Sequence, residues 1–497
     1  MLSRARLFFI LNLIFLGIIC FKSLDPNAFV KAPAPGSLAF YQGERLEFIG
    51  FVCEEADVNY KSRRLSVCAS DYRHDKVLIT TSLYPEYDYG DFLIIKGLLQ
   101  APPILEGFDY ARYLGRYGIA SVMYYPRLEK VGAKAGAPEL SSFSELSSSS
   151  ALGLFPDSQL SFRQKIYLQL LKAKWFLKKT MEKSLPEPEA GLAVALLLGY
   201  RRTILAEDAE VFARTGLSHL IAISGSHITI MSAMLVGALL FFGASRRQSL
   251  RGVFVFLAIY PLITGLSASA VRSAIMGGLM FLALYYGRLS SAINALIFSA
   301  ALMLVFNPRL LRDDIGFQLS FAAVLGIIYI YPLGSSLSSR IKRWTTRGAS
   351  TYRRRAGKLF LIFWEIFSLT FACQLAVTPI MLANFQQFSL VSFIANPVIA
   401  WIFPLLLGAL ILPLLPAALC SALGPWFFAP AYFLLALLFK TARFFSGLSW
   451  AASEVSNFSA GATIIYYSIL ISIVLIMRAK LKKKNACTKT KARNKQL

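Results

Sequence analysis

The stretch LSHLIAISGSHITIMSAMLVGALLFFGA, at residues 217–244, decides the fold class. It is apolar almost throughout, and about 20 such residues are enough for a helix to cross a bilayer. It opens an apolar region that continues to Met477. Short polar or turn-forming breaks divide this region into candidate spans; they lie at residues 245–251, 265–269, 287–291, 307–314, 335–358, 384–389, 413–417 and 447–460. We therefore expect a polytopic α-helical membrane protein.

The overall composition points the same way. Of the 497 residues, 56% are hydrophobic and 16% are charged, whereas soluble domains are about 45–50% apolar and about 25% charged. These values exclude a disordered chain and argue against a soluble enzyme. The net charge of +25 fits either a nucleic-acid partner or the charge asymmetry of membrane topology.

An N-terminal apolar segment adds one more expected span. Residues 7–21 follow Arg4 and Arg6. We interpret residues 1–22 as a retained transmembrane anchor, with a cleaved signal peptide as the alternative. The expected total is then about ten spans, and an even number places both termini on the same side of the membrane.

Basic residues predict the orientation, because loops rich in Lys and Arg stay in the cytoplasm. The loop at residues 335–358 and the tail at residues 481–497 are strongly basic and contain no acidic residue. Both clusters agree with cytoplasmic termini. Residues 23 to about 200 are then extracytoplasmic, and a polytopic domain occupies residues 188–480.

Residues 43–131 have a different pattern, in which short runs rich in Val, Ile, Leu and Tyr alternate with turn residues. We expect five strands: Arg45–Cys53, Arg64–Ala69, Lys76–Leu83, Asp91–Leu99 and Ile119–Tyr125. Five strands in about 90 residues suit an all-β barrel of the oligonucleotide/oligosaccharide-binding (OB) type, although another five-stranded barrel would give the same pattern. Cys53 and Cys68 lie on adjacent predicted strands. They form either a disulfide, in an oxidising compartment, or two free buried thiols.

A linker at residues 132–160 leads into a basic amphipathic helix at residues 161–184. This helix lies on the membrane surface, contacts the backbone of an incoming nucleic acid, or does both. Its candidate DNA-contacting residues are Lys165, Lys172, Lys174, Lys178 and Lys179.

Polar side chains within the apolar region are functional candidates, because they are costly in hydrocarbon. The densest cluster contains His219, Ser224, Gly225 and His227. A Ser-Gly pair in mid-span loosens a helix and exposes its backbone to a cavity. The cluster therefore lines a pore, serves helix packing through its small residues, or acts as a Ser–His hydrolase, which would also need an orienting acid.

Two further clusters follow along the chain. Arg272 lies inside an expected span, and an Arg there should face water or a carboxylate. Asp314 is its expected partner, since the span count places both on the same side. Other polar candidates for a translocation path are Gln318, Ser320, Gln374 and Asn396.

We expect no metal and no cofactor. The six cysteines include no Cys-x-x-Cys pair, and the three histidines are His74, His219 and His227. Neither a nuclease metal motif nor a phosphate-binding Gly-x-x-x-x-Gly-Lys-Ser/Thr loop occurs in the printed sequence. We therefore do not expect an enzyme.

Four of these segments, taken together, resemble the ComEC family of inner-membrane channels for DNA uptake in natural transformation. The segments are His219–His227 against the family pattern HLxAISGxH, Gly265–Met276 against GxSxSxxRxxIM, Asp314–Phe321 against DxGFQLSF, and Phe108–Tyr113 at the end of the outer barrel. They occur in the family's order, and the resemblance covers about residues 43–480.

The resemblance implies a channel that passes single-stranded DNA into the cytoplasm. It also implies membrane lipids as surroundings, a separate DNA receptor, a separate nuclease, a cytoplasmic helicase motor, and a possible homo-oligomer. Barrels of the OB type bind strands by base stacking and backbone charge. Candidate stacking residues are Tyr60, Tyr72, Tyr84, Tyr87 and Tyr89, with ordinary strand packing as the alternative.

The chain departs from the family in two respects. Its N-terminal anchor is a single short span where relatives often show more, and many members carry a C-terminal metallo-β-lactamase-like nuclease domain. We expect a short form without it, so strand degradation would depend on another protein. The remaining alternative functions are a secondary transporter of a small anionic solute, with Arg272 as countercharge, and an intramembrane hydrolase.

Overall fold

The computed structural model describes residues 4–22, 36–59, 61–70, 72, 75–105, 108–131, 162–288, 291–334, 351–455 and 458–493. The expected linker at 132–160, most of the basic loop at 335–358, the end of the tail, His74 and Tyr60 lie outside these residues. The chain divides into two compact units, Lys22–Lys179 and Met1–Phe21 with Thr180–Leu497. Each unit is treated by itself below.

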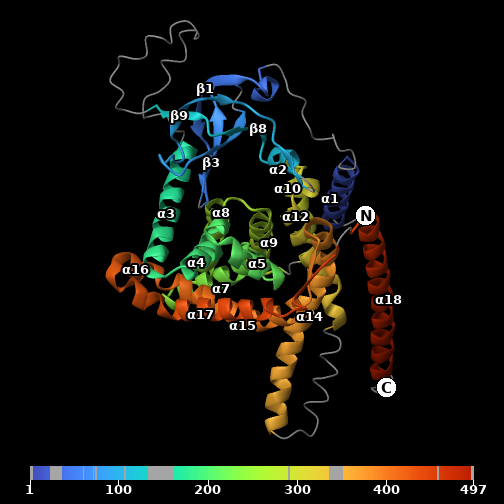
Figure 1. Cartoon of the computed structure of the whole chain (residues 1–497). Helices are drawn as coiled ribbons and strands as arrows, with labels where there is room; N and C mark the ends of the chain where they lie inside the picture. Colours follow the sequence, from blue (N-terminus) through green and yellow to red (C-terminus); the bar gives the residue numbers. More distant parts are fainter. Residues whose placement is uncertain are drawn as a thin grey trace, which may run out of the picture. The chain divides into compact units, whose positions relative to one another are not determined.

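The first unit is built on a β-sheet (Figure 1). Its strands are β1 (Arg45–Val52), β2 (Asp57–Val58), β3 (Arg63–Ala69), β4 (Lys76–Thr81), β5 (Phe92–Leu98), β8 (Ile119–Tyr124) and β9 (Arg127–Lys130). The order is β8-β4-β3-β1-β5-β9, with β2 paired to β3. Each of the five predicted strand segments coincides with one of these strands to within two residues at either end, and β2 and β9 were not predicted. Alternating apolar residues favour strands in these segments, since successive side chains point to opposite faces of a strand and one face can be buried.

The pairing within this sheet is antiparallel except for one parallel pair. β1 pairs with both β3 and β5, and β4 pairs in parallel with β8. An isolated antiparallel bridge joins Gln100, just after β5, to Val122 of β8. The remaining small elements are η1 (Leu38–Tyr41), β6 (Ile104–Leu105), β7 (Phe108–Asp109) and α2 (Tyr110–Gly115).

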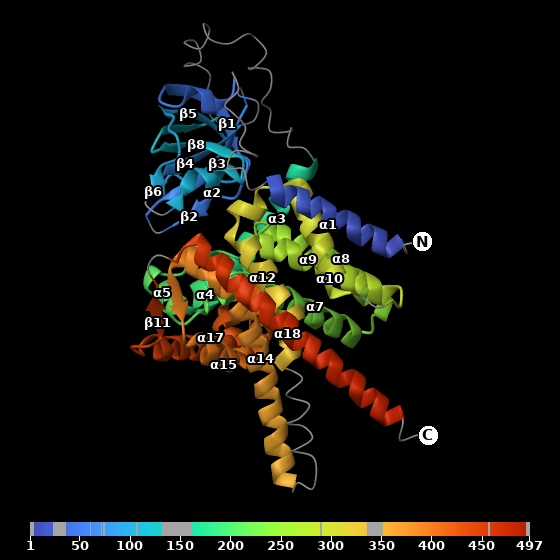
Figure 2. The same ribbon diagram turned by 90° about the vertical axis from the view of Figure 1, so that its right-hand side faces the viewer.

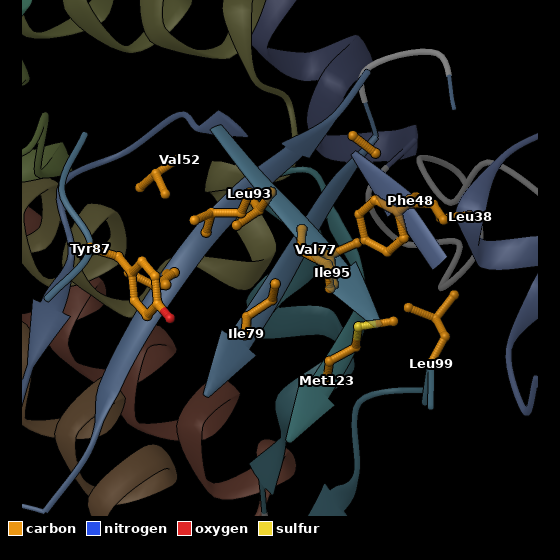
Figure 3. Packing of buried hydrophobic residues seen from close by; sticks show 13 residues of the cluster. Leu38, Phe48, Val52, Val77, Ile79, Tyr87, Leu93, Ile95, Leu99 and Met123 are labelled. Atoms are coloured by element: carbon orange, nitrogen blue, oxygen red, sulfur yellow. The ribbon is translucent and has the colours of Figure 1, made fainter. Parts of the chain in front are cut away.

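The inward-facing side chains of these strands form one apolar core (Figure 3). Val77 and Ile79 of β4 are fully buried and alternate with partly exposed neighbours. Leu93 and Ile95 of β5 and Met123 of β8 are equally buried in the same cluster. Strands that meet face to face across such a core hold the unit together by removing apolar surface from water.

The helix α3 (Phe162–Ser184) occupies the predicted amphipathic segment. Within the first unit, Lys174 Nζ lies 2.6 Å from Glu55 Oε2, and the ring of Tyr167 meets that of Tyr89 edge-on at 5.0 Å. These contacts attach one side of α3 to the sheet. Phe162 and Trp175 remain exposed.

The second unit is helical (Figure 2). It contains α1 (Arg4–Lys22), α4 (Glu189–Leu198), η3 (Arg201–Thr203), α5 (Ala206–Arg214), α6 (Ser218–Ile221), α7 (Gly225–Phe241), α8 (Arg246–Ile263), α9 (Ala268–Tyr285), α10 (Ala292–Phe306), α11 (Leu310–Asp313), α12 (Ile315–Tyr329), α14 (Thr351–Phe385), α15 (Ser392–Ile411), α16 (Leu414–Leu419), η4 (Ser421–Leu423), α17 (Gly424–Ser446) and α18 (Ala460–Arg493). Two short strands, β10 (Gln387–Ser389) and β11 (Ala452–Glu454), pair with each other.

Six helical segments of the described residues are long and apolar enough to cross a membrane by themselves. They are Ala268–Tyr285, Ile315–Gly334, Phe360–Phe385, Ser392–Leu419, Ser421–Ser446 and Gly461–Lys480. Shorter apolar helices lie at Ile10–Lys22, Glu189–Leu198, Gly225–Phe241 and Ala292–Phe306. The chain is a multi-pass membrane protein with an N-terminal β-sheet region. The expected count of about ten includes helices that are too short to cross alone.

Candidate functional site

The first polar motif forms the start of a helix rather than the middle of a span. The chain leaves α6 after Ile221 and begins α7 at Gly225, with Ser224 as its N-cap. The backbone N–H of Ser224 donates to His227 Nδ1 at 3.2 Å. A side chain from the third helical residue thus reaches back to the cap, as in a capping box. The predicted loosening at Ser224-Gly225 is a complete helix break.

The same residues do not form a complete catalytic triad. Ser224 Oγ lies 2.9 Å from His227 Nδ1, which is a distance that a nucleophile and its base would adopt. However, the buried His227 ring packs edge-on against Phe403 at 4.8 Å. Among the described residues, its Nε2 has no hydrogen-bond partner, so no carboxylate orients the ring. The contacts support a helix cap better than a hydrolase.

The segment before this motif is anchored by backbone contacts. Gly216 has a φ of +70°, and a Cβ atom there would lie 2.6 Å from Cβ of Ser392. Both the left-handed backbone and the close approach require glycine. The exposed His219 places its Nδ1 3.0 Å from the Gly216 carbonyl oxygen. His219 therefore supports this turn.

Arg272 lies in the second turn of α9 and is 6% exposed. Its Nε donates to Ser320 Oγ at 2.7 Å, and its Nη2 donates to Ser273 Oγ at 3.1 Å. Its Nη1 lies 3.3 Å from Met276 Sδ, and the guanidinium lies 5.9 Å from the centre of the Phe321 ring. All of these neighbours are electrically neutral.

The expected Arg272–Asp314 pair is wrong. Asp314 is the N-cap of α12, and its Oδ1 accepts the backbone N–H of Phe317 at 2.8 Å. A short carboxylate at a helix N-terminus satisfies an otherwise unpaired donor. In the described part of the chain, Arg272 forms no ion pair with an acidic side chain.

Three motifs that are far apart in the sequence meet at Arg272. A Cβ atom on Gly225 would lie 3.0 Å from Ser273 Oγ and 3.3 Å from Arg272 Nη2. Ser320 contributes the third motif from α12. The tertiary structure therefore brings α7, α9 and α12 together around one buried cation, which we call the Arg272 cluster: Gly225, Ser269, Arg272, Ser273 and Ser320.

Sequence reasoning missed Ser269 and Ser273 as members of the cluster. Ser273 Oγ donates to the Ser269 carbonyl oxygen at 2.7 Å, and Ser269 Oγ lies 3.1 Å from Ser320 Oγ. Residues three and four apart share one face of a helix. The spacing of the two serines around Arg272 was the signal that could have revealed them.

The remaining candidate residues of the membrane unit do not join the Arg272 cluster through any contact in the described chain. Gln318 Nε2 donates to the carbonyl oxygens of Leu311 and Arg312 at 3.0 Å each, so it holds the corner between α11 and α12. Gln374 lies on α14, where its backbone carbonyl oxygen accepts a hydrogen bond from the hydroxyl group of Thr378. Asn396 lies on α15, and its buried Oδ1 has no hydrogen-bond partner among the described residues.

Lys174 does not fit the role of a DNA contact. It is 4% exposed, and its ammonium group is paired with Glu55. Burial lowers its pKa, while the charge of Glu55 opposes this shift. Lys165, Lys172 and Lys179 are exposed on α3, and Lys178 is partly exposed.

Most of the tyrosines expected to stack on bases pack inside the domain instead. Tyr87 is 3% exposed in the core, and Tyr72 packs edge-on against Phe48. Tyr89 packs against Tyr167, whose pKa is raised to about 12 by burial and by the nearby Glu55 and Glu54 carboxylates. Among the expected stacking residues that the structure describes, Tyr84 is exposed, at 75%.

The structure joins Cys53 and Cys68 in a disulfide, which is one of the two alternatives that the sequence leaves open. Their Cα atoms are 5.7 Å apart. Cys53 follows β1, and Cys68 belongs to β3, its neighbour in the sheet.

Comparisons with known proteins address the membrane unit. The family model described as "Competence protein" matches residues 196–480, and these residues include all three motifs that contribute to the Arg272 cluster. "ComE operon protein 3" of Bacillus subtilis (strain 168) is 32% identical over 249 residues, which is 49% of this chain and 29% of the relative. "Uncharacterized protein YcaI" of Escherichia coli (strain K12) is 27% identical over 266 residues, which is 51% of this chain and 33% of the relative.

The chain thus matches about a third of the length of each curated relative. No solved structure matches it. The family model, in contrast, covers more than half of the chain and the residues that carry the polar motifs. The chain belongs to the competence protein family.

Proposed function

We propose that this protein is the inner-membrane channel that translocates single-stranded DNA into the cytoplasm during natural transformation. The observation that carries the proposal is the Arg272 cluster. A buried guanidinium is costly in hydrocarbon, and such groups mark pathways for polar or charged substrates. Here it is surrounded by serine hydroxyls from α9 and α12 and by the backbone of α7 at Gly225, which suits an anionic polymer.

Family membership supports the same conclusion. The relative from Bacillus subtilis is named for the ComE operon. The family model covers residues 196–480, which carry the polar motifs of the Arg272 cluster. A small anionic solute could also use a buried arginine, so the experiment below includes that outcome.

The proposed membrane arrangement has about ten crossings. Six segments can cross alone, and α1, α7, α10 and the apolar part of α8 after Arg251 would cross with help from neighbouring residues or packed helices. α4 is different, because every residue from Ala190 to Leu198 is buried. It would be a half-helix inside the bundle. The basic clusters place both termini in the cytoplasm and residues 23 to about 200 outside.

We also propose that the sheet domain is an OB-like barrel on the outer side. Its support is the pairing of β1 with both β3 and β5, together with the parallel pair β4–β8. The bridge between Gln100, which follows β5, and Val122 of the end strand β8 joins β8 back to the other side of the sheet. A five-stranded, partly open Greek-key barrel has this kind of connectivity. Lys165, Lys172 and Tyr84 are exposed groups on this domain for contact with a strand.

The channel would act with other components. A separate receptor would deliver the DNA, a nuclease would supply a single strand, and a cytoplasmic helicase would pull it inward. Lipids would surround the apolar helices; Ile464 of α18, for example, is 68% exposed. Assembly of several copies is part of the same proposal.

The test measures entry of end-labelled DNA into cells that lack the gene and into cells that carry it on a plasmid. We expect protected intracellular label only in the complemented cells. Labelled inorganic phosphate is measured in parallel as the small-anion control. Equal DNA entry with and without the gene would refute the channel, and gene-dependent entry of phosphate alone would favour a small-anion transporter.

A further inference from the structure

Arg272 is unusual among the buried charges in the described part of the chain, because all the acceptors that hold it are neutral. They are Ser320 Oγ, Ser273 Oγ and Met276 Sδ. Buried charges in proteins are normally paired with an opposite charge. The contrast within this chain is Asp208, also buried, which pairs with Arg443 at 3.0 Å.

The guanidinium of Arg272 has spare donor capacity. An arginine carries five N–H donors in a planar fork, and three hydrogen bonds account for the contacts of Arg272. One of the three acceptors is a thioether sulfur, which is a weak acceptor. An anion with several oxygens would satisfy this fork better than the present neighbours do.

The surroundings of the fork also favour an anion. Gly225 begins α7, so the positive end of this 17-residue helix lies beside Nη2. Since Gly225 has no side chain, the backbone of the first turn of α7 lies directly beside the guanidinium. Ser273 and Ser320 carry hydroxyl groups that can rotate and donate to an incoming oxygen.

A phosphodiester group matches this chemistry. Hydrogen bonds between a guanidinium and a phosphate are charge-assisted and about twice as strong as those to neutral acceptors. A phosphate would therefore displace the serine and methionine acceptors, whereas a resident carboxylate would compete with it. The neutral partners leave Arg272 available.

We propose that Arg272 is the binding site for a backbone phosphodiester of the DNA strand, which replaces Ser320, Ser273 and Met276 as its acceptors. This inference rests on the proposed channel function. Because Ser320 belongs to α12 and Arg272 to α9, binding of the phosphate releases one direct hydrogen bond between these helices, while Ser269 Oγ of α9 remains beside Ser320 Oγ. The strand thus loosens the cluster that it passes.

A matched pair of variants tests the proposal. Ser320→Asp places a carboxylate beside Arg272 Nε, while Ser320→Asn places a neutral group of nearly the same size there. We expect DNA entry with Ser320→Asp to be at least about tenfold lower than with Ser320→Asn, since a charge-assisted pair must be broken for each phosphate. Both variants are checked for their amount in the membrane fraction.

Equal DNA entry with the two variants, at equal protein amounts, would overturn the phosphate site and leave the channel intact. If wild-type protein fails to import DNA, the proposed function itself fails. These two failures are therefore distinguishable.

A second measurement uses the unmodified protein, in case either variant does not accumulate. The probe is an end-labelled single strand whose central linkages are uncharged methylphosphonates. We expect the end label that follows the methylphosphonate segment to enter at least about tenfold less than the same label on an all-phosphodiester strand. Equal entry of the two strands would refute the proposal.

Discussion

The backbone of Gly225 lies directly against the guanidinium of Arg272, since a Cβ atom on Gly225 would be 3.3 Å from Nη2. The same Cβ would be 3.0 Å from Ser273 Oγ. This contact joins α7 to α9 at the Arg272 cluster, and it is close enough that one methyl group would displace the polar groups by a few tenths of an ångström.

Gly225→Ala should therefore reduce DNA entry severalfold while the protein remains folded. Alanine is better than glycine in a helix by about 1 kcal/mol, which offsets part of an overpacking cost of about 1–3 kcal/mol. The measurements are protein amount in membranes and entry of labelled DNA. Gly237→Ala is the control on the same helix, because its Cβ would meet no atom within 4 Å. Equal DNA entry in both variants would show that the Gly225 contact has no role in transport.

Gly326→Ala should destabilise the membrane unit itself. A Cβ atom on Gly326 of α12 would lie 2.5 Å from the backbone oxygen of Ala372 and 2.9 Å from Ala376 Cβ on α14. The two helices must separate, at a cost of about 1–3 kcal/mol. Thermal unfolding in detergent, followed by circular dichroism, should show a lower midpoint. Gly278→Ala on α9 has no atom within 4 Å of its Cβ and should not lower the midpoint, since alanine favours a helix more than glycine does. Equal midpoints in the two variants would contradict the close packing.

The disulfide between Cys53 and Cys68 should stabilise the sheet domain. It closes a loop with a sequence separation of 15, and a loop of this length contributes about 3 kcal/mol in the chain-entropy model. Replacing both cysteines with serine should make the domain more sensitive to protease and denaturant. In wild-type protein, a thiol reagent should modify these two cysteines only after reduction. Modification before reduction would show that the bond is absent.

Lys174→Met should weaken the attachment of α3 to the sheet. Removal of the ammonium group leaves Glu55 without its partner at 2.6 Å. Because the Glu55 side chain is 29% exposed, the expected loss is about 1–3 kcal/mol, below that of a fully buried pair. Chemical unfolding monitored by Tyr fluorescence measures it. Lys172→Met, at an exposed position of the same helix, should unfold at the wild-type denaturant concentration.

The pH dependence of unfolding gives a separate test of Lys174. Burial lowers its pKa in the folded protein, so the unfolded chain binds the proton more tightly. The contribution of Lys174 to the free energy of unfolding therefore rises with pH. The rise extends from the pKa of Lys174 in the folded protein up to about 10.4, where an unfolded lysine deprotonates. The measurement stays below pH about 10, because tyrosines titrate above it. A wild-type slope equal to that of Lys174→Met would mean that Lys174 titrates normally.

The class of protein and its main elements could be predicted from the sequence. Apolar runs of sufficient length and their breaks are local properties, so they indicate helices that enter a membrane and turns between them. Strand alternation is also local, and it predicted the positions of the five main strands. The adjacency of Cys53 and Cys68 followed from the order of those strands. The length of each helix could not be predicted from the sequence, because a Ser-Gly pair interrupts a helix only when the cap contacts form.

The partners of individual polar groups were decided by the tertiary structure alone. Arg272 has Ser320 as its acceptor instead of Asp314, since Asp314 satisfies the backbone at the start of its own helix. Lys174 resembles its neighbours in sequence, yet it alone of the five candidate lysines is buried, against Glu55. Sequence determines which residues are polar within an apolar segment and therefore costly. Only packing between distant segments determines which neighbours relieve that cost, because hydrogen bonds and ion pairs depend on distances of a few ångströms that no spacing along the chain specifies.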